Sequence, residues 1–414
     1  MVAAIGESLS EPSTTQLQPI DTRLWAVAHA IGWIARKLIF RQHNSYLAPL
    51  PPTGPYLLLG NHAAALDPVV MTFGVPQPIH FMASEQLFRI GRLGDILRRM
   101  GTFPKAKYAR DPESIDHMVA LNADGRVVGL FPEGNRTWDG RPGPVLPGLG
   151  WLIRKIQGPV VFVRNTTGWL LQPRWARYPR LVPMELEYSE PVTFPEDWSA
   201  SRIEQEIAQR IAIDPATVKL RGRAWGFRMA HGLPDYLWAC PVCFTTDALV
   251  VHPKDGDRVD CAACRAAWRV DVMQALQPID GSPAFTVATA FDAIVAHFGE
   301  LPTVDPDRFI AEGVALEDRD MGVQRLTESG PEAVAKGPAQ LLADRLRVGV
   351  GEGAWEILFE DVKAVSIEVE NALQVRTASE LFQLVPAQGS TLKWNHFLHA
   401  HHSRSRPTRR GRKR

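Results

Sequence analysis

A histidine and an aspartate stand close together just after an apolar segment of the chain. The apolar segment is Tyr56–Leu59, and it leads into the sequence GNHAAALDP (60–68). Four residues separate His62 from Asp67, so the chain can turn back and bring the carboxylate to one imidazole nitrogen. A carboxylate there fixes the ring tautomer and stabilises the imidazolium that forms when His62 accepts a proton. The pair thus has the composition of a general base with its orienting partner.

The same two residues also have a purely structural interpretation. A residue before proline is pushed out of the helical region, so Asp67 suits the N-cap of a helix with Pro68 at its first position. On these residues alone, the safer interpretation of His62 is a strand-end histidine beside an ordinary helix cap.

A second motif, FPEGNRT (131–137), follows another apolar segment about seventy residues later. Together with the first motif it resembles the glycerolipid acyltransferases, the family of 1-acyl-glycerol-3-phosphate acyltransferases with a His-x4-Asp motif. Between the two, GTFPKAK (101–107) is similar to the family's second motif, with Lys107 where an Arg is usual. PVVFV (159–163) corresponds to a fourth motif, whose usual proline-containing turn is replaced by Arg164-Asn165. The resemblance spans roughly 56–191.

The resemblance implies a role for each matching residue. His62 is the expected base and Asp67 its partner. The expected acceptor site is formed by Glu133, Gly134 and Arg136, and the acceptor phosphate is expected to be held by Lys107 and, more loosely, by Lys105 and Arg110. Lysine binds phosphate as a point charge and lacks the bidentate geometry of arginine. Because Lys107 replaces the usual Arg, the sequence does not determine whether the acceptor has a phosphate head group. Taken singly, Lys105 and Arg110 are also explained as solvated surface charges.

The residues around His62 favour direct acyl transfer over a covalent acyl-enzyme. No cysteine precedes residue 240, and positions 63–66 offer no hydroxyl, so no nucleophile stands next to the base. We expect an acceptor hydroxyl, deprotonated by His62, to attack the thioester of acyl-CoA or acyl carrier protein. A thiol of pKa about 8.5 is a good leaving group.

All four cysteines of the chain form two Cys-x-x-Cys pairs, Cys240/Cys243 and Cys261/Cys264, separated by seventeen residues. This spacing resembles zinc ribbons and predicts a closed four-thiolate site whose zinc is structural. Two redox dithiols are the alternative. A ribbon can also bind nucleic acid, but the charges of the segment are mixed, so no specific nucleic-acid partner is expected.

The composition is that of a globular protein, with 414 residues, 45% hydrophobic, 22% charged and a net charge of +1. Paired Cys-x-x-Cys motifs and an N-terminus without signal-peptide character favour a cytoplasmic location. The last twelve residues, 403–414, carry seven Lys/Arg and no acid. Such a tail is attracted to anionic lipid, although non-specific affinity for nucleic acid explains it as well.

A helix expected at Leu24–Phe40 is too short and too charged to span a bilayer. Leu24, Val27, Ile31, Ile34 and Leu38 share one face, which is the pattern of a helix lying in a membrane interface. A surface helix packed on its own domain fits the pattern equally well.

Alternating apolar strands and amphipathic helices after this helix predict an α/β acyltransferase domain with a mixed sheet. The expected strands are Tyr56–Leu59, Ile79–Met82, Val127–Phe131, Pro159–Val163 and Met184–Tyr188. The expected helices are Pro68–Phe73, Leu93–Met100, Pro112–Ala123, Gly148–Ile156 and Ala200–Ile213. Past the cysteines, a helix at Ala284–Phe298 precedes strands at Gln340–Val348, Trp355–Phe359, Val365–Val369, Leu373–Arg376 and Leu381–Val385 and a closing helix at Ser390–His402. This last region loosely resembles pleckstrin-homology (PH) or GRAM domains.

The sequence thus predicts a helix and Pro-rich joint (1–55), an acyltransferase domain (56–230), a zinc ribbon (231–280), a β-rich PH/GRAM-like domain (281–402) and a basic tail (403–414). The expected function is acylation of a lysophospholipid, with lysophosphatidic acid as first candidate, by an enzyme peripheral on the inner face of the membrane. Three alternatives stay open: another acceptor such as an amino-acid-containing lyso-lipid, a catalytically silent lipid-surface scaffold, and a zinc-ribbon nucleic-acid binder.

Overall fold

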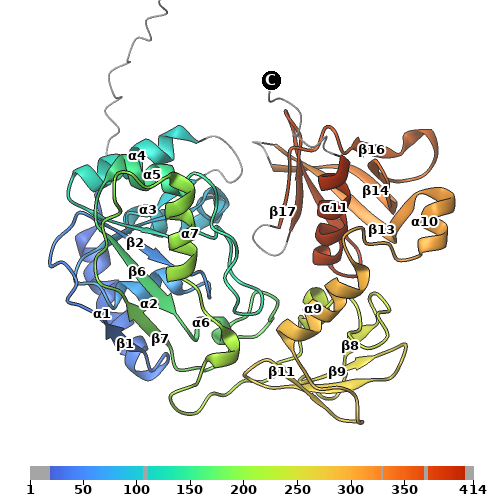
Figure 1. The fold of residues 1–414 in the computed structure, drawn as a ribbon, viewed down its shortest axis with the longest axis horizontal. Coiled ribbons are helices and arrows are strands. Elements are labelled where there is room, and N and C mark those ends of the chain that lie inside the picture. Colours follow the sequence, from blue (N-terminus) through green and yellow to red (C-terminus); the bar gives the residue numbers. More distant parts are fainter. Residues whose placement is uncertain (1–18, 106–110, 328–329, 368–371, 406–414) are drawn as a thin grey trace, which may run out of the picture. The chain divides into compact units, whose positions relative to one another are not determined.

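The computed structural model describes residues 19–105, 111–327, 330–367 and 372–405, and the chain divides into two compact units (Figure 1). The first unit contains 1–137, 141–168 and 183–221, and the second contains 138–140, 169–182 and 222–414. Residues 169–182 and 222–230 fall within the expected 56–230 domain but lie in the second unit, because Trp175 and Ala230 pack into its core.

A seven-stranded sheet forms the centre of the first unit. Its order is β1 (His43–Tyr46), β7 (Glu185–Tyr188), β6 (Val160–Asn165), β2 (Tyr56–Gly60), β5 (Val127–Leu130), β3 (Ile79–Ser84) and β4 (Phe103–Lys105). Neighbouring strands are parallel except β6 and β7, which are antiparallel. The expected α/β domain with a mixed sheet is thereby confirmed. Strands β1 and β4 escaped prediction because they are short and lack an apolar run.

Helices surround this sheet (Figure 1): α1 (Thr22–Leu38), α2 (Asp67–Thr72), α3 (Gly91–Arg99), α4 (Pro112–Ala123), α5 (Leu149–Ile156) and α7 (Ala200–Arg210), with short 3-10 turns η1 (Glu85–Arg89) and η2 (Pro215–Thr217). Every residue of β2 is buried. Alternate residues of β2, β5 and β6 form one core with apolar side chains of α4, α5 and α7, including Met118, Leu152 and Ile207. These three helices therefore cover one face of the sheet.

Helix α1 contacts the first unit through one side only. Its Gly32 lies against Phe73, where a Cβ would come within 2.2 Å of the ring, and Arg36 donates to the Phe73 carbonyl at 3.2 Å. The predicted apolar face, with Val27, Ile31 and others, stays exposed. No helix in the described part of the chain has the length and apolarity to cross a bilayer.

The second unit contains two antiparallel sheets, the short helix α8 (Leu233–Tyr236) and all but the first residue of α6 (Gly168–Leu171). The five-stranded sheet has the order β12 (Phe285–Thr286), β11 (Ala275–Pro278), β10 (Ala267–Val270), β9 (Arg258–Cys261) and β8 (Leu249–Val251). The seven-stranded sheet has the order β16 (Trp355–Leu358), β15 (Arg345–Val348), β14 (Gly330–Leu342), β13 (Val314–Thr327), β19 (Leu381–Pro386), β18 (Leu373–Arg376) and β17 (Ala364–Ile367). Helices α9 (Val287–Phe298) and α10 (Pro306–Glu312) connect the two sheets, turn η3 (Gly351–Gly353) joins β15 to β16, and α11 (Thr391–Ser405) follows the last strand.

The prediction of one strand over Gln340–Val348 is wrong. The chain turns at Ala343-Asp344, and β14 pairs with β15 as an antiparallel hairpin. The long strand β13 was missed because polar residues and register shifts interrupt its apolar alternation. The region nevertheless is β-rich and ends in a helix, as expected.

One hydrophobic core joins the cysteine-containing sheet to the C-terminal sheet. Buried Trp238 packs against Phe298 and Phe397 from α9 and α11. Next to this core Lys393 is buried, and its ammonium pairs with Asp247 and, at 3.2 Å, with Asp318. Two carboxylates from different segments thus share one buried cation.

We expect Lys393→Ala to destabilise the second unit by about 3–5 kcal/mol, because it leaves Asp247 and Asp318 without the cation that compensates their partial burial. Lys336 is the control: its ammonium also pairs with an aspartate, Asp320, but its side chain is 75% exposed against 1% for Lys393. Lys336→Ala is expected to change the free energy of unfolding by no more than about 1 kcal/mol. Urea titration of both variants makes the comparison, and equal effects would contradict it.

Candidate functional site

His62 and Asp67 meet as the sequence predicts. His62 Nδ1 lies 2.9 Å from Asp67 Oδ2, and because a carboxylate only accepts, the imidazole donates. The side chain of Asp67 is fully buried and that of His62 is partly exposed. The proton on Nδ1 places the ring lone pair on Nε2, which is the arrangement of a general base.

The Asp67 carboxylate is held by two further donors. Its Oδ2 accepts from the Ala64 N–H at 2.8 Å and its Oδ1 accepts from Asn165 Nδ2 at 2.8 Å. The prediction that Asp67 caps α2 is wrong: Asp67 is the first residue of the helix, and Leu66 precedes it without a side-chain cap. The carboxylate turns away from the helix because these donors and His62 occupy its oxygens.

Asn165 at the end of β6 is a positioning residue that the sequence prediction missed. Its Oδ1 accepts from the Gly168 N–H at 2.9 Å, so its Nδ2 must be the atom that faces Asp67. Asn61 supports it, since Asn61 Oδ1 accepts from the Asn165 N–H at 2.7 Å. The signal in the sequence is the Arg164-Asn165 departure from the family's fourth motif, which by itself indicates only that the usual proline turn is replaced.

The loop that follows β5 wraps around His62. The His62 N–H donates to Glu133 Oε1 at 3.1 Å, and the His62 carbonyl accepts from the Thr137 N–H at 2.9 Å. The imidazole stacks on Phe131 with ring centroids 4.2 Å apart. The FPEGNRT segment (131–137) thus fixes both the backbone and the ring of the candidate base.

Glu133 is the second buried carboxyl of the site. Burial raises the pKa of its carboxyl to about 8, against which the hydrogen bonds from His62 and Gly143 act only partly. Among the described residues its Oε2 has no hydrogen-bond partner. Near neutral pH the structure therefore favours a protonated Glu133.

Gly134 and Arg136 complete the same loop. Gly134 has a φ of 69°, and a Cβ there would come within 2.5 Å of Leu146 Cδ1, so the turn requires glycine. The Arg136 guanidinium is half-buried, and burial lowers its pKa while the Asp67 charge raises it. Its guanidinium makes no hydrogen bond within the part of the chain that the structure describes.

Of the three expected phosphate ligands, Lys105 lies in the described part of the chain. Lys105 ends β4, and its ammonium pairs with Asp111 at 3.4 Å. Lys107 and Arg110 lie outside the described residues.

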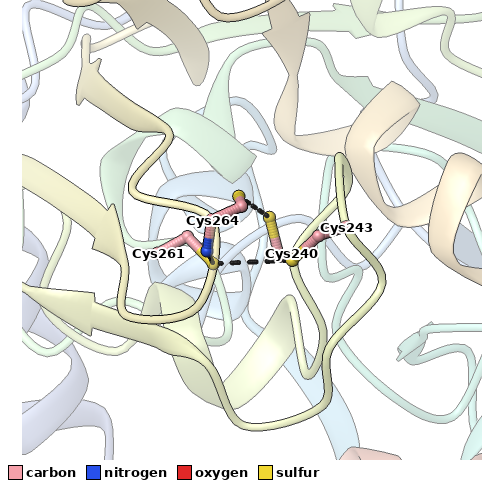
Figure 2. Close-up of side chains that lie close together, drawn as sticks. All are labelled: Cys240, Cys243, Cys261 and Cys264. Atoms are coloured by element: carbon pink, nitrogen blue, oxygen red, sulfur yellow. Dashed lines mark hydrogen bonds between the residues drawn. The ribbon is translucent and has the colours of Figure 1, made fainter.

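The four cysteines form a cluster in the second unit (Figure 2). Their sulfur atoms lie within 4.8 Å of one another, and the sulfurs of Cys240 and Cys264 and of Cys243 and Cys261 are 3.8 and 3.7 Å apart. A tetrahedron of thiolates about 2.3 Å from zinc has edges of about 3.8 Å. The donor set therefore fits a four-thiolate zinc ion, and the contacts of 3.8 and 3.7 Å join one cysteine of each Cys-x-x-Cys motif to one of the other.

Both cysteine loops have the same backbone design. The Phe244 N–H donates to the Cys240 carbonyl and the Arg265 N–H to the Cys261 carbonyl, each at 2.9 Å. Phe244 and Arg265 have positive φ values of 58° and 67°. Amide N–H groups of Val242 and Cys264 face the sulfurs of Cys240 and Cys261 at 3.4 Å, a contact that stabilises thiolates.

Sequence comparison places the His62–Asp67 pair in a known family segment. Residues 42–164 match the family model described as Acyltransferase, which confirms the expected resemblance for this segment. Asn165 lies one residue beyond the match.

Two curated proteins named 1-acyl-sn-glycerol-3-phosphate acyltransferase are similar to this segment. The one from Bacillus subtilis is 31% identical over 94 residues, which cover 22% of this chain and 47% of that protein. The one from Borreliella burgdorferi is 29% identical over 93 residues, which cover 22% of this chain and 37% of that protein. The chain thus spans less than half the length of these relatives.

A solved structure, the 1-acyl-sn-glycerophosphate (LPA) acyltransferase PlsC from Thermotoga maritima, is 19% identical with a TM-score of 0.38. The alignment covers 45% of this chain and 76% of that one. A score this low does not establish a shared fold.

We expect the buried Glu133 carboxyl to make folding stability depend on pH. Since its pKa rises from 4.5 to about 8 on folding, the stability that the protonated form contributes is present at acidic pH. It is lost as pH rises from 4.5 through about 8, because the carboxyl ionises freely in the unfolded chain while burial keeps it protonated in the folded one. Glu133→Gln keeps an oxygen for the His62 N–H and does not titrate.

Urea unfolding across this pH range tests the expectation. The stability of the native protein relative to Glu133→Gln should fall as pH rises, whereas the exposed control Glu196→Gln should show no such trend. A pH-independent difference between native protein and Glu133→Gln would refute the raised pKa.

Proposed function

We propose that this protein is an acyltransferase that moves a fatty acyl group from acyl-CoA or acyl carrier protein to a lysophospholipid, with lysophosphatidic acid as first candidate. The observation that carries the proposal is the His62 Nδ1–Asp67 contact of 2.9 Å on a fully buried carboxylate. The similarity of residues 42–164 to acyltransferases supports it.

In this proposal His62 acts as a general base for direct transfer. Its Nε2 removes the proton from the acceptor hydroxyl while Asp67 stabilises the imidazolium. The acceptor oxygen attacks the thioester carbonyl, the C–O bond forms and the C–S bond breaks. The thiolate that leaves takes the proton from the imidazolium, since a thiol of pKa about 8.5 is the weaker acid.

We assign the acceptor site to Glu133, Gly134 and Arg136. Glu133 holds the His62 backbone beside the acceptor through Oε1, and the half-buried Arg136 guanidinium suits an anionic group such as a phosphate. Lys107 and, more loosely, Lys105 and Arg110 are proposed to approach the same phosphate. Because Lys107 replaces the usual Arg, an amino-acid-containing lyso-lipid remains the second acceptor candidate.

We propose that α1 rests on the inner face of the membrane, with the enzyme in the cytoplasm. Its exposed face carries Val27, Ile31, Ile34 and Leu38, and it contacts Phe73 at the end of the helix that begins with Asp67. Lipid inserted beside α1 would therefore lie close to the element that carries the catalytic carboxylate.

We further propose a structural zinc ion held by Cys240, Cys243, Cys261 and Cys264, with the segment 231–280 as a zinc ribbon. Four protein ligands leave no open position, so the metal stabilises the fold and takes no part in catalysis. We regard 281–402 as a PH/GRAM-like module, supported by seven antiparallel strands followed by a helix, and 403–414 as a basic tail that binds anionic lipid.

We expect His62→Ala to lower thiol release from palmitoyl-CoA in the presence of lysophosphatidic acid by about 10²–10⁴-fold, the contribution of a positioned general base. The matched control is His43→Ala, an exposed histidine in the same unit, which should retain full turnover. If His62→Ala leaves turnover unchanged, His62 is not the general base and the proposed mechanism is wrong.

A panel of acceptors separates the remaining candidates. Preference for lysophosphatidic acid supports the first acceptor, and preference for a phosphate-free lyso-lipid selects the second. Absence of turnover with every acceptor, by a protein that still binds vesicles, would favour a silent scaffold.

We expect metal analysis to find one zinc ion per chain, and Cys240→Ser to release it and lower the thermal stability of the second unit, because a structural zinc site contributes folding free energy. Protein without metal, with disulfides within each Cys-x-x-Cys pair by mass spectrometry, would instead identify two redox dithiols.

A further inference from the structure

An aromatic surface on the second unit has no role in the proposed reaction. Leu181, Trp225 and Phe227 are 47%, 62% and 45% exposed, and Tyr178 and Arg228 lie beside them. Large side chains this exposed, and clustered, mark an interaction site more often than chance exposure. We call these five residues, with Arg223, the aromatic surface.

The aromatic surface is built on a fixed backbone. Leu181 and Trp225 form an antiparallel bridge, with N–H to carbonyl distances of 2.8 and 2.9 Å in the two directions. The Phe227 ring contacts Trp225 and Tyr178 at centroid distances of 5.9 and 5.2 Å.

The buried Arg180 ties this backbone to the core of the second unit. Arg180, next to Leu181, donates to the carbonyls of Val272 and Met229 at 3.2 and 3.4 Å. The exposed rings are therefore held outward by the core and are not the tip of an unsupported loop.

The charge of the aromatic surface is positive. Arg228 donates to the Tyr178 hydroxyl at 3.0 Å and lies over its ring. Arg223 is exposed and makes no ion pair within the described residues. The surrounding segment 215–234 contains no Asp or Glu, so these charges are not neutralised along the chain.

We propose that the aromatic surface is a membrane-contact site that binds an anionic lipid surface. Tryptophan and tyrosine partition to the bilayer interface, where leucine and phenylalanine insert and arginine meets lipid phosphate. A protein partner would need a shape-matched interface of about 800 Å² on each side, whereas lipid adapts to three protruding apolar side chains. The proposal goes beyond acyl transfer, because this binding requires no turnover.

Sedimentation of the 414-residue chain with phosphatidylcholine vesicles, with and without phosphatidylglycerol, tests the proposal. Trp225→Ser/Phe227→Ser should weaken binding to both vesicles by at least about tenfold, since it removes two inserted side chains. Arg223→Ala should weaken binding about fivefold, and only to the anionic vesicles. Because Arg223 is exposed, this variant keeps the test informative if the double variant fails to fold.

Two controls separate this site from other effects. Ile310→Ser changes an exposed apolar residue elsewhere in the same unit and should bind like the native protein. His62→Ala should also bind normally, so a failure of the proposed chemistry is distinguishable from a failure of this surface.

Vesicle binding that both surface variants retain in full overturns the proposal. Retained vesicle binding together with lost binding to the acidic acyl carrier protein also overturns it, and identifies the surface as a protein-docking site.

Discussion

The burial of the Asp67 carboxylate is the constraint on which the rest of the candidate site depends. A buried carboxylate is costly unless donors surround it, and here the donors are the Ala64 N–H, the His62 imidazole and the Asn165 amide. They come from the loop after β2 and from the end of β6. The parallel pairing of β2 with β6 therefore sets the position of the candidate base.

Glu133 shows what happens to a carboxyl without that compensation. One of its oxygens accepts from the His62 N–H, but the other is buried without a partner in the described structure. Burial consequently raises its pKa. Two carboxyl groups beside one histidine thus differ in their chemistry because one is surrounded by donors and the other is not, which is how neighbouring carboxyls acquire separate roles.

The second unit is stabilised by a few residues that join distant segments. The cysteine loops, the Trp238 core and the buried Lys393 with Asp247 and Asp318 connect the five-stranded sheet to the C-terminal sheet and α11. Asp247 lies between the two Cys-x-x-Cys motifs. The cysteine loops, the Trp238 core and the Lys393 ion pairs are therefore expected to unfold together.

The sequence by itself determined the features that depend on local pattern. Apolar runs predicted the five inner strands of the first sheet and most of the helices around it within about three residues. Motif spacing predicted that His62 meets Asp67 and that four cysteines cluster. The errors arose where long-range contacts override local preference. Asp67 was assigned to a helix cap because only tertiary structure brings Asn165, 98 residues away, to its carboxylate.

The same reason explains what the tertiary structure alone decided. Sheet pairing makes 340–348 a hairpin and not the single strand that the sequence predicts. The packing of Trp175 places 169–182 in the second unit and not in the acyltransferase domain. The exposed aromatic surface depends on a bridge between Leu181 and Trp225, which no local pattern reveals. Local sequence encodes spacing and amphipathicity, but which donors meet a buried charge and which rings stay outside are set by contacts between residues far apart in the chain.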